Sequence, residues 1–348
     1  MVMTAFAAQR QDLGTVRFAW SPAWETLLAV RMFVDPRGRP YHQTWHAAVA
    51  AEAARLRLTP LLAVNPMRGS VPDFLAPPPR GPAPRFADQL EEIRATPADQ
   101  VGEELRRCRN TLTGSAVGAV DEMLADPAAA RDLLAGQLQA AWERLVAPYW
   151  PRIVAVLDAD VAHRSRQLTD QGLRPMLDGI DARISWGDGA VVVDDGVDLT
   201  VELCGRGLVL MPSAYIWPVV AAIVDEPWQP TIVYPARGIG SLWEQAAPPP
   251  DALVQLLGRT RALLLARLDR PASTSTLAAL HGLSPSGTSK HLIAMRDAGL
   301  VTGTRHGHEV RYARTQLGTA LCRAAGAAGA AGDRTAKVTA RRRPNTLT

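Results

Sequence analysis

Hydrophobic and polar positions follow two different periods along the first 250 residues of the chain. Up to about residue 171, apolar residues recur every three or four positions, which predicts amphipathic helices. From about residue 182 onward, apolar and polar residues alternate between glycine-rich turns, which predicts strands joined by hairpins. This part of the chain is therefore expected to be an α+β domain, in which helices come first and an antiparallel sheet follows.

The expected elements can be placed from these periods and from turn and cap residues. A first strand is expected at 15–21, and helices are expected at 22–34, 42–58, 86–94, 97–110, 127–146 and 150–171. The proline-rich stretch 65–85 predicts a long exposed loop. The later strands are expected at 182–186, 190–194, 200–204, 208–215, 219–225 and 231–236.

The pattern becomes helical again after the stretch "AAPPP" at 246–250. Helices are expected at 251–269 and 273–282, and a third begins at Ser284, because Ser-Pro is a strong helix start. The third helix is expected to bury Thr288, Leu292 and Met295. Strands at 300–305 and 309–314 follow, joined by a turn at 305–308, and a last helix begins near Thr315. This order predicts a winged helix-turn-helix, a DNA-binding architecture.

Charge divides the chain at the same place. Residues 251–348 hold 15 Lys/Arg and 5 Asp/Glu, a net charge of +10, whereas residues 1–250 hold 23 and 29, a net charge of −6. We therefore expect an α+β sensor and dimerisation domain at 1–245, a linker at 246–250, a DNA-binding domain at 251–325, and a disordered basic tail at 326–348.

The start of the third helix carries the residues that suit contact with double-stranded DNA. Ser286, Gly287 and Ser289 are small enough to let a helix enter the major groove, and Lys290 adds positive charge. The expected wing adds basic and imidazole side chains, which suit the neighbouring backbone or minor groove. These wing residues are Arg305, His306, His308 and Arg311.

The stretch "LSPSGTSKHLIAMRDAGLVTGTRHGHEVRYARTQLG" resembles the ArsR-type winged-helix repressors over about 260–322. The resemblance implies a homodimer that uses the helix at 251–269 to dimerise. It also implies DNA contacts from Ser286, Ser289, Lys290, His291, Arg305, His306 and Arg311. Ser284, as the helix cap, and the small Gly287 complete the expected DNA-binding set. The segments "WPRIVAVLDADVAHRSR", "GRGLVLMPSAYIWP" and "QPTIVYPARGIGSLW" resemble a subgroup with a large uncharacterised N-terminal domain.

The chain departs from the metal-sensing members of that family. They hold a cysteine pair before the recognition helix or Asp/His clusters on the last helix, whereas 273–282 has no cysteine and Cys322 stands alone. One thiolate does not complete a soft-metal site. No metal and no cofactor is therefore expected.

No nucleophile elbow, dinucleotide fingerprint or P-loop occurs in the sequence, so no catalytic residue is expected. The acidic motif with Asp158, Asp160 and His163 brings at most two ligands to one helical face. A solvated face with local salt bridges to Arg164 and Arg166 is the preferred interpretation. The stretch "WGDGAVVVDDGVD" misses the calcium-loop spacing and is better explained by hairpin turns.

The nine tryptophans fit two interpretations that the sequence leaves open. They line an apolar pocket for a small organic effector, or they belong to the core and to interfaces, the usual role of aromatics. All nine precede residue 250, namely Trp20, Trp24, Trp45, Trp142, Trp150, Trp186, Trp217, Trp228 and Trp243.

The leading hypothesis is a homodimeric, sequence-specific transcriptional regulator that responds to an effector. Repression is expected rather than activation. Three distant cysteines, no secretory signal and no apolar run of 18 residues predict a cytoplasmic protein without a membrane partner. Two alternatives stay open. One is an enzyme with its active site in 1–245 and a winged helix for targeting, and the other is a winged helix that binds protein.

Overall fold

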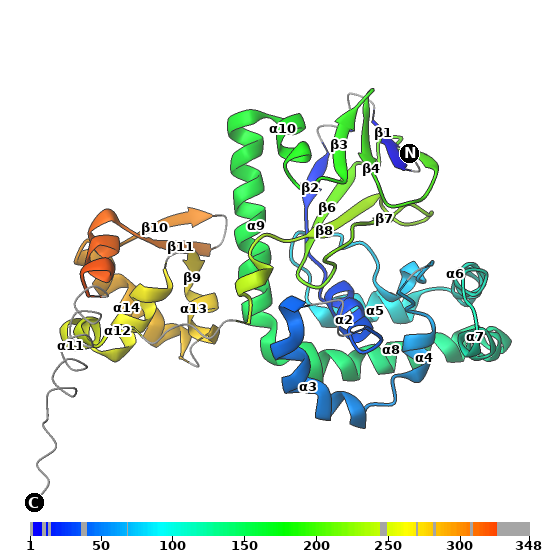
Figure 1. Cartoon of the computed structure of the whole chain (residues 1–348), viewed down its shortest axis with the longest axis horizontal. Coiled ribbons are helices and arrows are strands. Elements are labelled where there is room, and N and C mark those ends of the chain that lie inside the picture. The colour runs from blue at the N-terminus through cyan, green and yellow to red at the C-terminus, as the bar shows by residue number, and fades with distance from the viewer. Residues whose placement is uncertain are drawn as a thin grey trace, which may run out of the picture. The chain divides into compact units, whose positions relative to one another are not determined.

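The computed structural model describes residues 3–8, 12, 15–35, 40–67, 69–243, 249–268, 271–280, 283–306 and 309–325. The chain divides into two compact units, Met1–Trp243 and Glu244–Thr348, called here the N-terminal and C-terminal units. Only residues 249 and 250 of the expected linker are described, and the expected tail at 326–348 lies outside the described residues. Helices and sheets both occur, as the α+β expectation requires (Figure 1).

The N-terminal unit begins its helices where cap residues occur. Ser21 Oγ accepts a hydrogen bond from Trp24 N at 3.0 Å, and Asp126 Oδ1 accepts one from Ala129 N at 3.0 Å. The long helices that the sequence predicts are confirmed, whereas α4, α7 and α10 were not predicted. The helices are α2 (Pro22–Arg31), α3 (Gln43–Arg55), α4 (Thr59–Ala63), α5 (Phe86–Ala95), α6 (Ala98–Arg109), α7 (Ser115–Ala125), α8 (Pro127–Ala141), α9 (Trp150–Gln171) and α10 (Leu173–Asp178).

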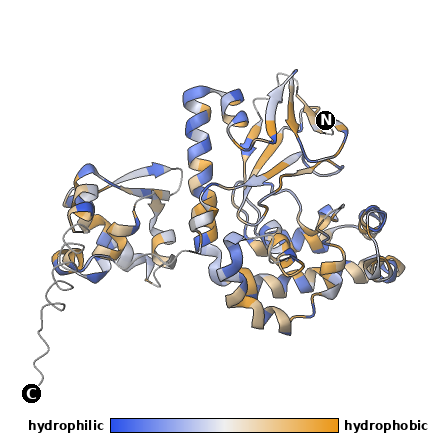
Figure 2. Ribbon diagram, in the orientation of Figure 1, coloured by the Kyte–Doolittle hydropathy of each residue, from blue (hydrophilic) through white to orange (hydrophobic). Residues whose placement is uncertain are grey.

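Short helical turns complete this layer. They are η1 (Pro40–His42), η2 (Asp73–Leu75), the π-turn η3 (Trp142–Val146), η4 (Ala147–Tyr149) and η5 (Ile239–Ser241). The first half of α9 is apolar and the second half polar, as the change from orange to blue along it shows (Figure 2). Its apolar residues Ile153 and Leu157 are fully buried in the core that the other helices form.

Eight strands of this unit form two four-stranded sheets. One sheet has the order β3-β4-β1-β5 and the other has the order β2-β6-β8-β7. The strands are β1 (Thr4–Ala7), β2 (Val16–Phe18), β3 (Ile184–Gly187), β4 (Ala190–Val193), β5 (Leu199–Glu202), β6 (Leu208–Ser213), β7 (Ala221–Ile223) and β8 (Thr231–Pro235).

The expectation of a single antiparallel arrangement is wrong. β1 pairs in parallel with β5, and β6 pairs in parallel with both β2 and β8. The turn between β5 and β6 carries the chain from one sheet to the other, with Cys204 at φ 48°, Gly205 at φ 81° and Gly207 at φ 69°. A residue that is distant in sequence stabilises this turn, because Gly205 N donates a hydrogen bond to Asp12 Oδ1 at 2.7 Å. A Cβ at Gly207 would lie 2.7 Å from Thr15 O, so only glycine fits there.

The two sheets pack against each other, and the second also packs against the helices. Phe6 and Val191 of the first sheet share one buried cluster with Leu210 and Tyr234 of the second. Met211 and Val233, on the opposite face of the second sheet, belong to the helical core. The unit therefore has three layers: helices, the β2-β6-β8-β7 sheet and the β3-β4-β1-β5 sheet.

The proline-rich stretch 65–85 is not an exposed loop, which corrects a second expectation. Phe74, Leu75 and Ala76 are fully buried in the helical core. Pro79 O accepts from Arg17 Nη2 at 2.6 Å, and Phe74 N donates to Glu104 Oε2 at 2.7 Å. Proline has no N–H group, so a proline-rich segment can be buried without leaving donors unpaired.

The C-terminal unit has its own core. Leu253, Leu264, Leu292, Met295 and Tyr312 are among its buried members. The expected helix at 251–269 is two helices, because Gly258 adopts φ 77° and separates them. The elements are α11 (Asp251–Leu257), α12 (Arg259–Arg267), β9 (Ala272–Ser273), α13 (Thr274–Leu280), α14 (Pro285–Asp297), β10 (Val301–His306), β11 (Glu309–Arg314) and a helix over 316–325.

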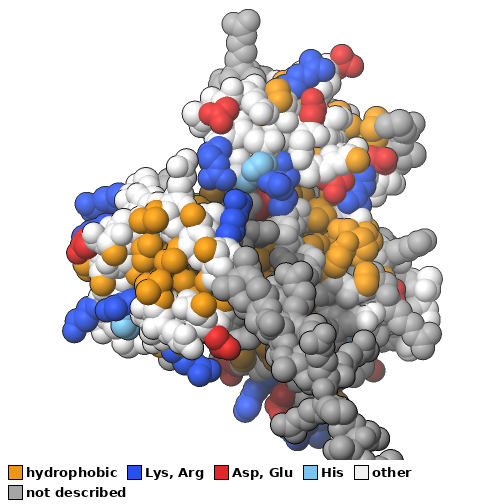
Figure 3. Space-filling model, turned by 60° about the vertical axis from the view of Figure 1, so that its left-hand side comes forward, with side chains coloured by type: hydrophobic (Ala, Val, Ile, Leu, Met, Phe, Trp, Pro, Cys, Tyr) orange, Lys and Arg blue, Asp and Glu red, His pale blue; other side chains and the backbone are white. Residues whose placement is uncertain are grey.

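Some large apolar side chains remain exposed. Leu256 is 65% exposed and Leu317 is 59% exposed. Figure 3 shows hydrophobic side chains gathered in patches on the face drawn, with Lys and Arg dispersed between them. Within the described ranges, no helix combines the length and the apolar character that crossing a bilayer requires.

Candidate nucleic-acid interface

The start of α14 is built by a side-chain cap. Ser284 Oγ accepts a hydrogen bond from Gly287 N at 3.1 Å, and Pro285 occupies the first helical position. A Cβ at Gly287 would lie 2.9 Å from Ser284 Oγ, so a larger residue there would disturb the cap. The first turn contains no acidic residue. The helix start therefore keeps its partial positive charge and a slim profile.

The two faces of α14 differ as the spacing predicts. Thr288, Leu292 and Met295 are buried, which confirms the expected inner face. On the outer face Ser286 and Lys290 are exposed, whereas Gly287, Ser289 and His291 are half-buried. Among the described residues no carboxylate pairs with Lys290.

The hairpin that follows α14 is held at its base. Gly299, at φ 71°, ends the helical segment, and Leu300 N donates to Met295 O at 2.9 Å. β10 and β11 pair in antiparallel register, with Thr304 opposite Arg311. β9 adds a third strand to β11; the sequence did not predict it, because two residues carry no detectable period.

The expected wing residues lie at the far part of this hairpin. Arg305 is exposed opposite Val310, and Arg311 is half-buried on the other face of the ribbon. The side chain of His306, and residues 307 and 308, lie outside the described residues.

The described part of the C-terminal unit is rich in basic residues. It holds the acids Asp251, Asp297 and Glu309. Asp297 accepts from Arg296 Nη2 at 3.0 Å. The basic residues are Arg259, Arg261, Arg267, Lys290, Arg296, Arg305, Arg311, Arg314 and Arg323. The described residues of this unit therefore carry an excess of positive charge, which raises the electrostatic potential around them.

The acidic motif of α9 has a structural role, and its interpretation as a solvated face is wrong. Asp160 and Arg164 are 1% and 3% exposed. Tyr234 Oη donates to Asp160 Oδ2 at 2.9 Å, and Arg237 N donates to Oδ1 at 3.1 Å. Burial is the main cause that lowers the pKa of His163, and the positive charge of Arg237 lowers it further. Within the described residues, no three ligating side chains gather as a metal site would need.

Arg164 completes this buried connection. Its guanidinium donates to Gly179 O at 2.7 Å and to Ile180 O at 3.3 Å, and its Nε lies 3.7 Å from Asp160 Oδ1. The pair therefore ties α9 to the end of β8 and to the turn after α10. The sequence showed the charges but not their burial, because β8 follows more than 70 residues later.

The tryptophans divide between the two interpretations that the sequence left open. Trp45 and Trp243 are buried, with Trp45 Nε1 donating to Leu145 O at 3.0 Å and Trp243 Nε1 to His42 Nδ1 at 2.8 Å. These two indoles form one cluster with the rings of His42 and Tyr215, in which neighbouring centroids lie 4.7 to 6.3 Å apart, so the rings fill this part of the core. Trp228, in contrast, lines a pocket.

Two carboxyl groups with a raised pKa, the buried Glu25 and the half-buried Asp73, were not found from the sequence. Burial raises the pKa of Glu25 to about 8, against hydrogen bonds from Ser213, Ala214 and Tyr215. Burial, together with Glu104 and Asp225, raises the pKa of Asp73 to about 8. Glu25 lies in α2, where residues 22–30 are all buried, and Asp73 lies in a proline-rich stretch. A single acidic residue gives no sequence signal of burial at either position.

Comparisons with known proteins concern the N-terminal unit alone. Residues 105–240 match the model of a family of unknown function, DUF5937. The match runs from α6 to η5 and leaves out β1, β2 and the C-terminal unit. No curated protein and no solved structure matches the chain.

Proposed function

We propose that the protein is a sequence-specific DNA-binding transcriptional regulator whose C-terminal unit is a winged helix-turn-helix. The observation that carries the proposal is the start of α14, which is capped by Ser284, free of acid, and exposes Ser286 and Lys290. α13 precedes this helix and the β10–β11 hairpin follows it. The resemblance to ArsR-type repressors assigns the same residues to DNA contact.

The chemistry of the helix start supports a duplex as the partner. Small polar side chains and backbone N–H groups can approach base edges and phosphates closely, and the helix end adds partial positive charge. The hairpin offers Arg305 and Arg311 to the neighbouring backbone or groove. His291 follows Lys290 in α14 and is half-buried, which suits a phosphate contact at the rim of the interface.

In the proposed mechanism the regulator acts as a homodimer and represses its target. An effector that binds the DNA-incompetent arrangement more tightly shifts the population toward it and releases the operator. Because a dimer carries two copies of α14, the operator is expected to be a pair of half-sites related by two-fold symmetry.

The test is binding of the full chain to labelled DNA from its own upstream region, followed by fluorescence anisotropy over a series of salt concentrations. Lys290→Ala is expected to weaken binding and to lower the salt slope by about one unit, because one phosphate contact is lost. Arg296→Ala is the matched control, since it removes a charge that Asp297 already neutralises at the other end of the same helix.

Three results would contradict the proposal. If Lys290→Ala bound DNA like the wild type at every salt concentration, α14 would not be part of the interface. If the wild type did not bind at low salt, DNA would not be its partner. If it bound an unrelated duplex of the same length with equal affinity, the binding would not be sequence-specific. Sedimentation of the same preparation measures whether the complex contains two copies of the chain.

A further inference from the structure

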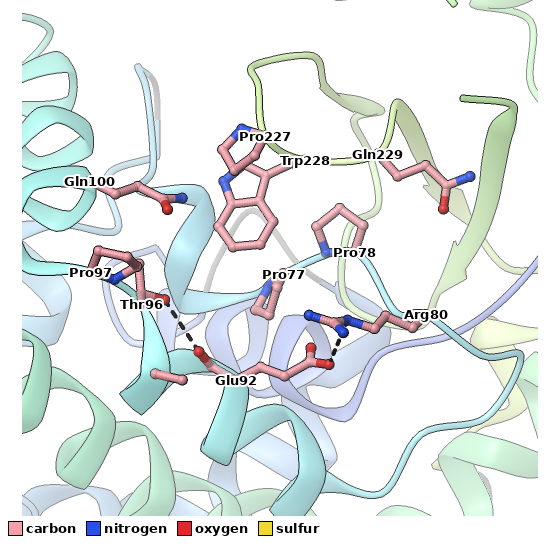
Figure 4. Close-up of a pocket in the computed structure, with 11 residues that line it drawn as sticks. Pro77, Pro78, Arg80, Glu92, Thr96, Pro97, Gln100, Pro227, Trp228 and Gln229 are labelled. Carbon is pink, nitrogen blue, oxygen red and sulfur yellow. Dashed lines mark hydrogen bonds and ion pairs between the residues drawn. The ribbon is translucent and has the colours of Figure 1, made fainter. Parts of the chain in front are cut away.

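The N-terminal unit contains a pocket of about 430 Å³ on its helical side. Figure 4 shows the Trp228 indole above Pro77, with Pro78 and Pro97 nearby and Glu92 along the floor. The volume lies in the range of small-molecule sites. The lining residues come from the η2 loop, from α5 and α6, and from the loop before β8, so the pocket depends on the folded unit.

Trp228 is held in place by a buried carboxylate. Its Nε1–H donates to Glu104 Oε1 at 3.0 Å, and Glu104 is 2% exposed. Gln100 Nε2 donates to the same oxygen at 2.9 Å, and Phe74 N donates to Glu104 Oε2 at 2.7 Å. Three N–H donors therefore fix Glu104, and Glu104 in turn fixes the plane of the indole ring.

This arrangement makes the face of Trp228 a good partner for a cation. An indole that donates its N–H proton to a carboxylate gains electron density in the ring, and tryptophan is the best aromatic cation–π partner. Among the described residues, no Lys, Arg or His forms an ion pair with Glu104. Its partners are therefore N–H donors rather than a cationic side chain.

The pocket offers few donors to an anion. Four lining residues are prolines, which have no backbone N–H: Pro77, Pro78, Pro97 and Pro227. Gln100 Nε2 donates to Glu104, and Gln229 Nε2 donates to Arg206 O at 2.7 Å. Arg80 is already paired with Glu92, at 3.0 Å. An anion would thus displace several existing bonds, whereas a cation would displace only the exposed Arg80–Glu92 pair.

Glu92 supplies a carboxylate that can change partners. Its side chain lines the pocket, while the Arg80 side chain that pairs with it is 87% exposed. Such an exposed pair contributes little free energy in water. A cation inside the pocket, shielded by Trp228 and the prolines, can therefore replace Arg80 as the partner of Glu92.

We propose that this pocket binds a planar organic cation, stacked on Trp228 and neutralised by Glu92. The indole and the apolar Pro77 below it suit a flat ring system, and the carboxylates select its charge. The ligand's regulatory effect on DNA binding rests on the proposed function, whereas its binding to the pocket does not.

The experiment titrates the full chain, without DNA, with three tricyclic probes of one shape. Proflavine is a cation at neutral pH, acridine is neutral, and acridine-9-carboxylate is an anion. Binding is measured by isothermal calorimetry and by proflavine anisotropy. Proflavine is expected to bind about tenfold more tightly than acridine, and the carboxylate more weakly than either.

Two variants locate the site. Trp228→Leu keeps apolar bulk and removes the π face, and Glu92→Gln removes the carboxylate; each is expected to weaken proflavine binding about tenfold. Glu92→Gln should change acridine binding less than about twofold. Glu91→Gln is the matched control, because Glu91 is the exposed neighbour on α5 and is not among the residues that line the pocket. Thermal melting verifies that each variant is folded.

Several results would overturn the proposal. They are proflavine binding no tighter than acridine, tightest binding of the carboxylate, unchanged proflavine binding in both folded variants, or no binding at millimolar concentration. DNA binding is measured separately and without probe, because proflavine itself intercalates. A protein that binds the upstream DNA but not proflavine disproves only this inference, and the reverse disproves only the proposed function.

Discussion

The two units differ in how far along the chain their contacts reach. In the C-terminal unit, β10 pairs with β11, which directly follows it, and α14 packs against nearby α12 and α13. In the N-terminal unit, Thr4–Ala7 pairs with strands at 190–193 and 199–202. Local periodicity therefore predicts the fold of the C-terminal unit, but only part of the fold of the N-terminal unit.

They also differ in what they bury. Buried polar residues of the described C-terminal unit are Ser273 and Thr288, both small and uncharged. The N-terminal unit buries Glu25, Glu104 and the Asp160–Arg164 pair. Charged groups in a core make stability depend on pairing and on pH, so the two units should respond differently to the same perturbations.

The largest effect is expected from Asp160→Ala, which leaves Arg164 buried without its carboxylate. We expect the free energy of unfolding of the N-terminal unit to fall by about 3 kcal/mol. Tryptophan fluorescence during urea unfolding reports on this unit alone, because all nine tryptophans lie in it. Arg166→Ala, exposed on the same helix, is the control and should change stability by less than about 0.5 kcal/mol. Equal effects of both changes would contradict the buried connection.

A comparable perturbation of the C-terminal unit is Leu292→Ala, which removes a fully buried side chain from its core. The expected loss is about 2 to 3 kcal/mol in this unit, with no shift of the tryptophan transition. Scanning calorimetry separates the two transitions. The adjacent Ile293 is 39% exposed, so Ile293→Ala should cost much less. A shifted tryptophan transition in Leu292→Ala would show that the cores are not independent.

A pH series sharpens the contrast in buried charge. The pKa of Glu25 is about 8 in the folded protein against an ordinary 4.5, so between these values the folded state keeps a proton that the unfolded chain loses. Stability of the N-terminal unit should therefore fall as pH rises from about 5 to 8, and Glu25 alone contributes a slope of at most about 1.4 kcal/mol per pH unit.

Glu25→Gln should flatten this dependence, and Glu25→Gln with Asp73→Asn should flatten it further, since Asp73 shifts in the same direction. The readout is the urea midpoint by tryptophan fluorescence at each pH. A wild type that becomes more stable between pH 5 and pH 8, with no difference from the variants, would contradict a protonated Glu25.

The smallest effect concerns Gly258, where α11 ends and α12 begins. Gly258→Ala places a side chain at φ 77° but in open space, so only backbone strain is added. The expected loss is about 1 kcal/mol in the C-terminal unit by calorimetry. Gly136→Ala, inside α8 and also in open space, is the control and should be neutral or stabilising. A gain in stability at Gly258 would mean that one continuous helix is accessible.

Sequence reasoning worked where a local signal was sufficient. Ser284-Pro285 fixed the start of α14, and the spacing of Thr288, Leu292 and Met295 fixed its buried face. It failed where partners are distant: β1 is four residues long and its partners lie beyond residue 189. It also failed at 65–85, because a proline-rich composition is common to exposed loops and to buried segments without free donors.

The candidate site shows the same division. The order of elements and the exposure of Ser286 and Lys290 follow from the sequence, because helix period and cap residues are local. The pocket at Trp228 does not, since its walls come from segments near residues 77, 97 and 228 that only the folded unit brings together. Nothing in the sequence around Trp228 distinguishes it from Trp45, which is core.

The central place of β1 has a consequence for how the chain is made. During translation Thr4–Ala7 is made long before the two strands that flank it, which emerge nearly 190 residues later. Closing so long a loop is slow, so the helical layer is expected to collapse before either sheet is complete. Until both flanking strands have been made, the unpaired backbone groups of β1 can pair with an incorrect strand. Binding of chaperones to the nascent chain should therefore be greatest at that stage of synthesis.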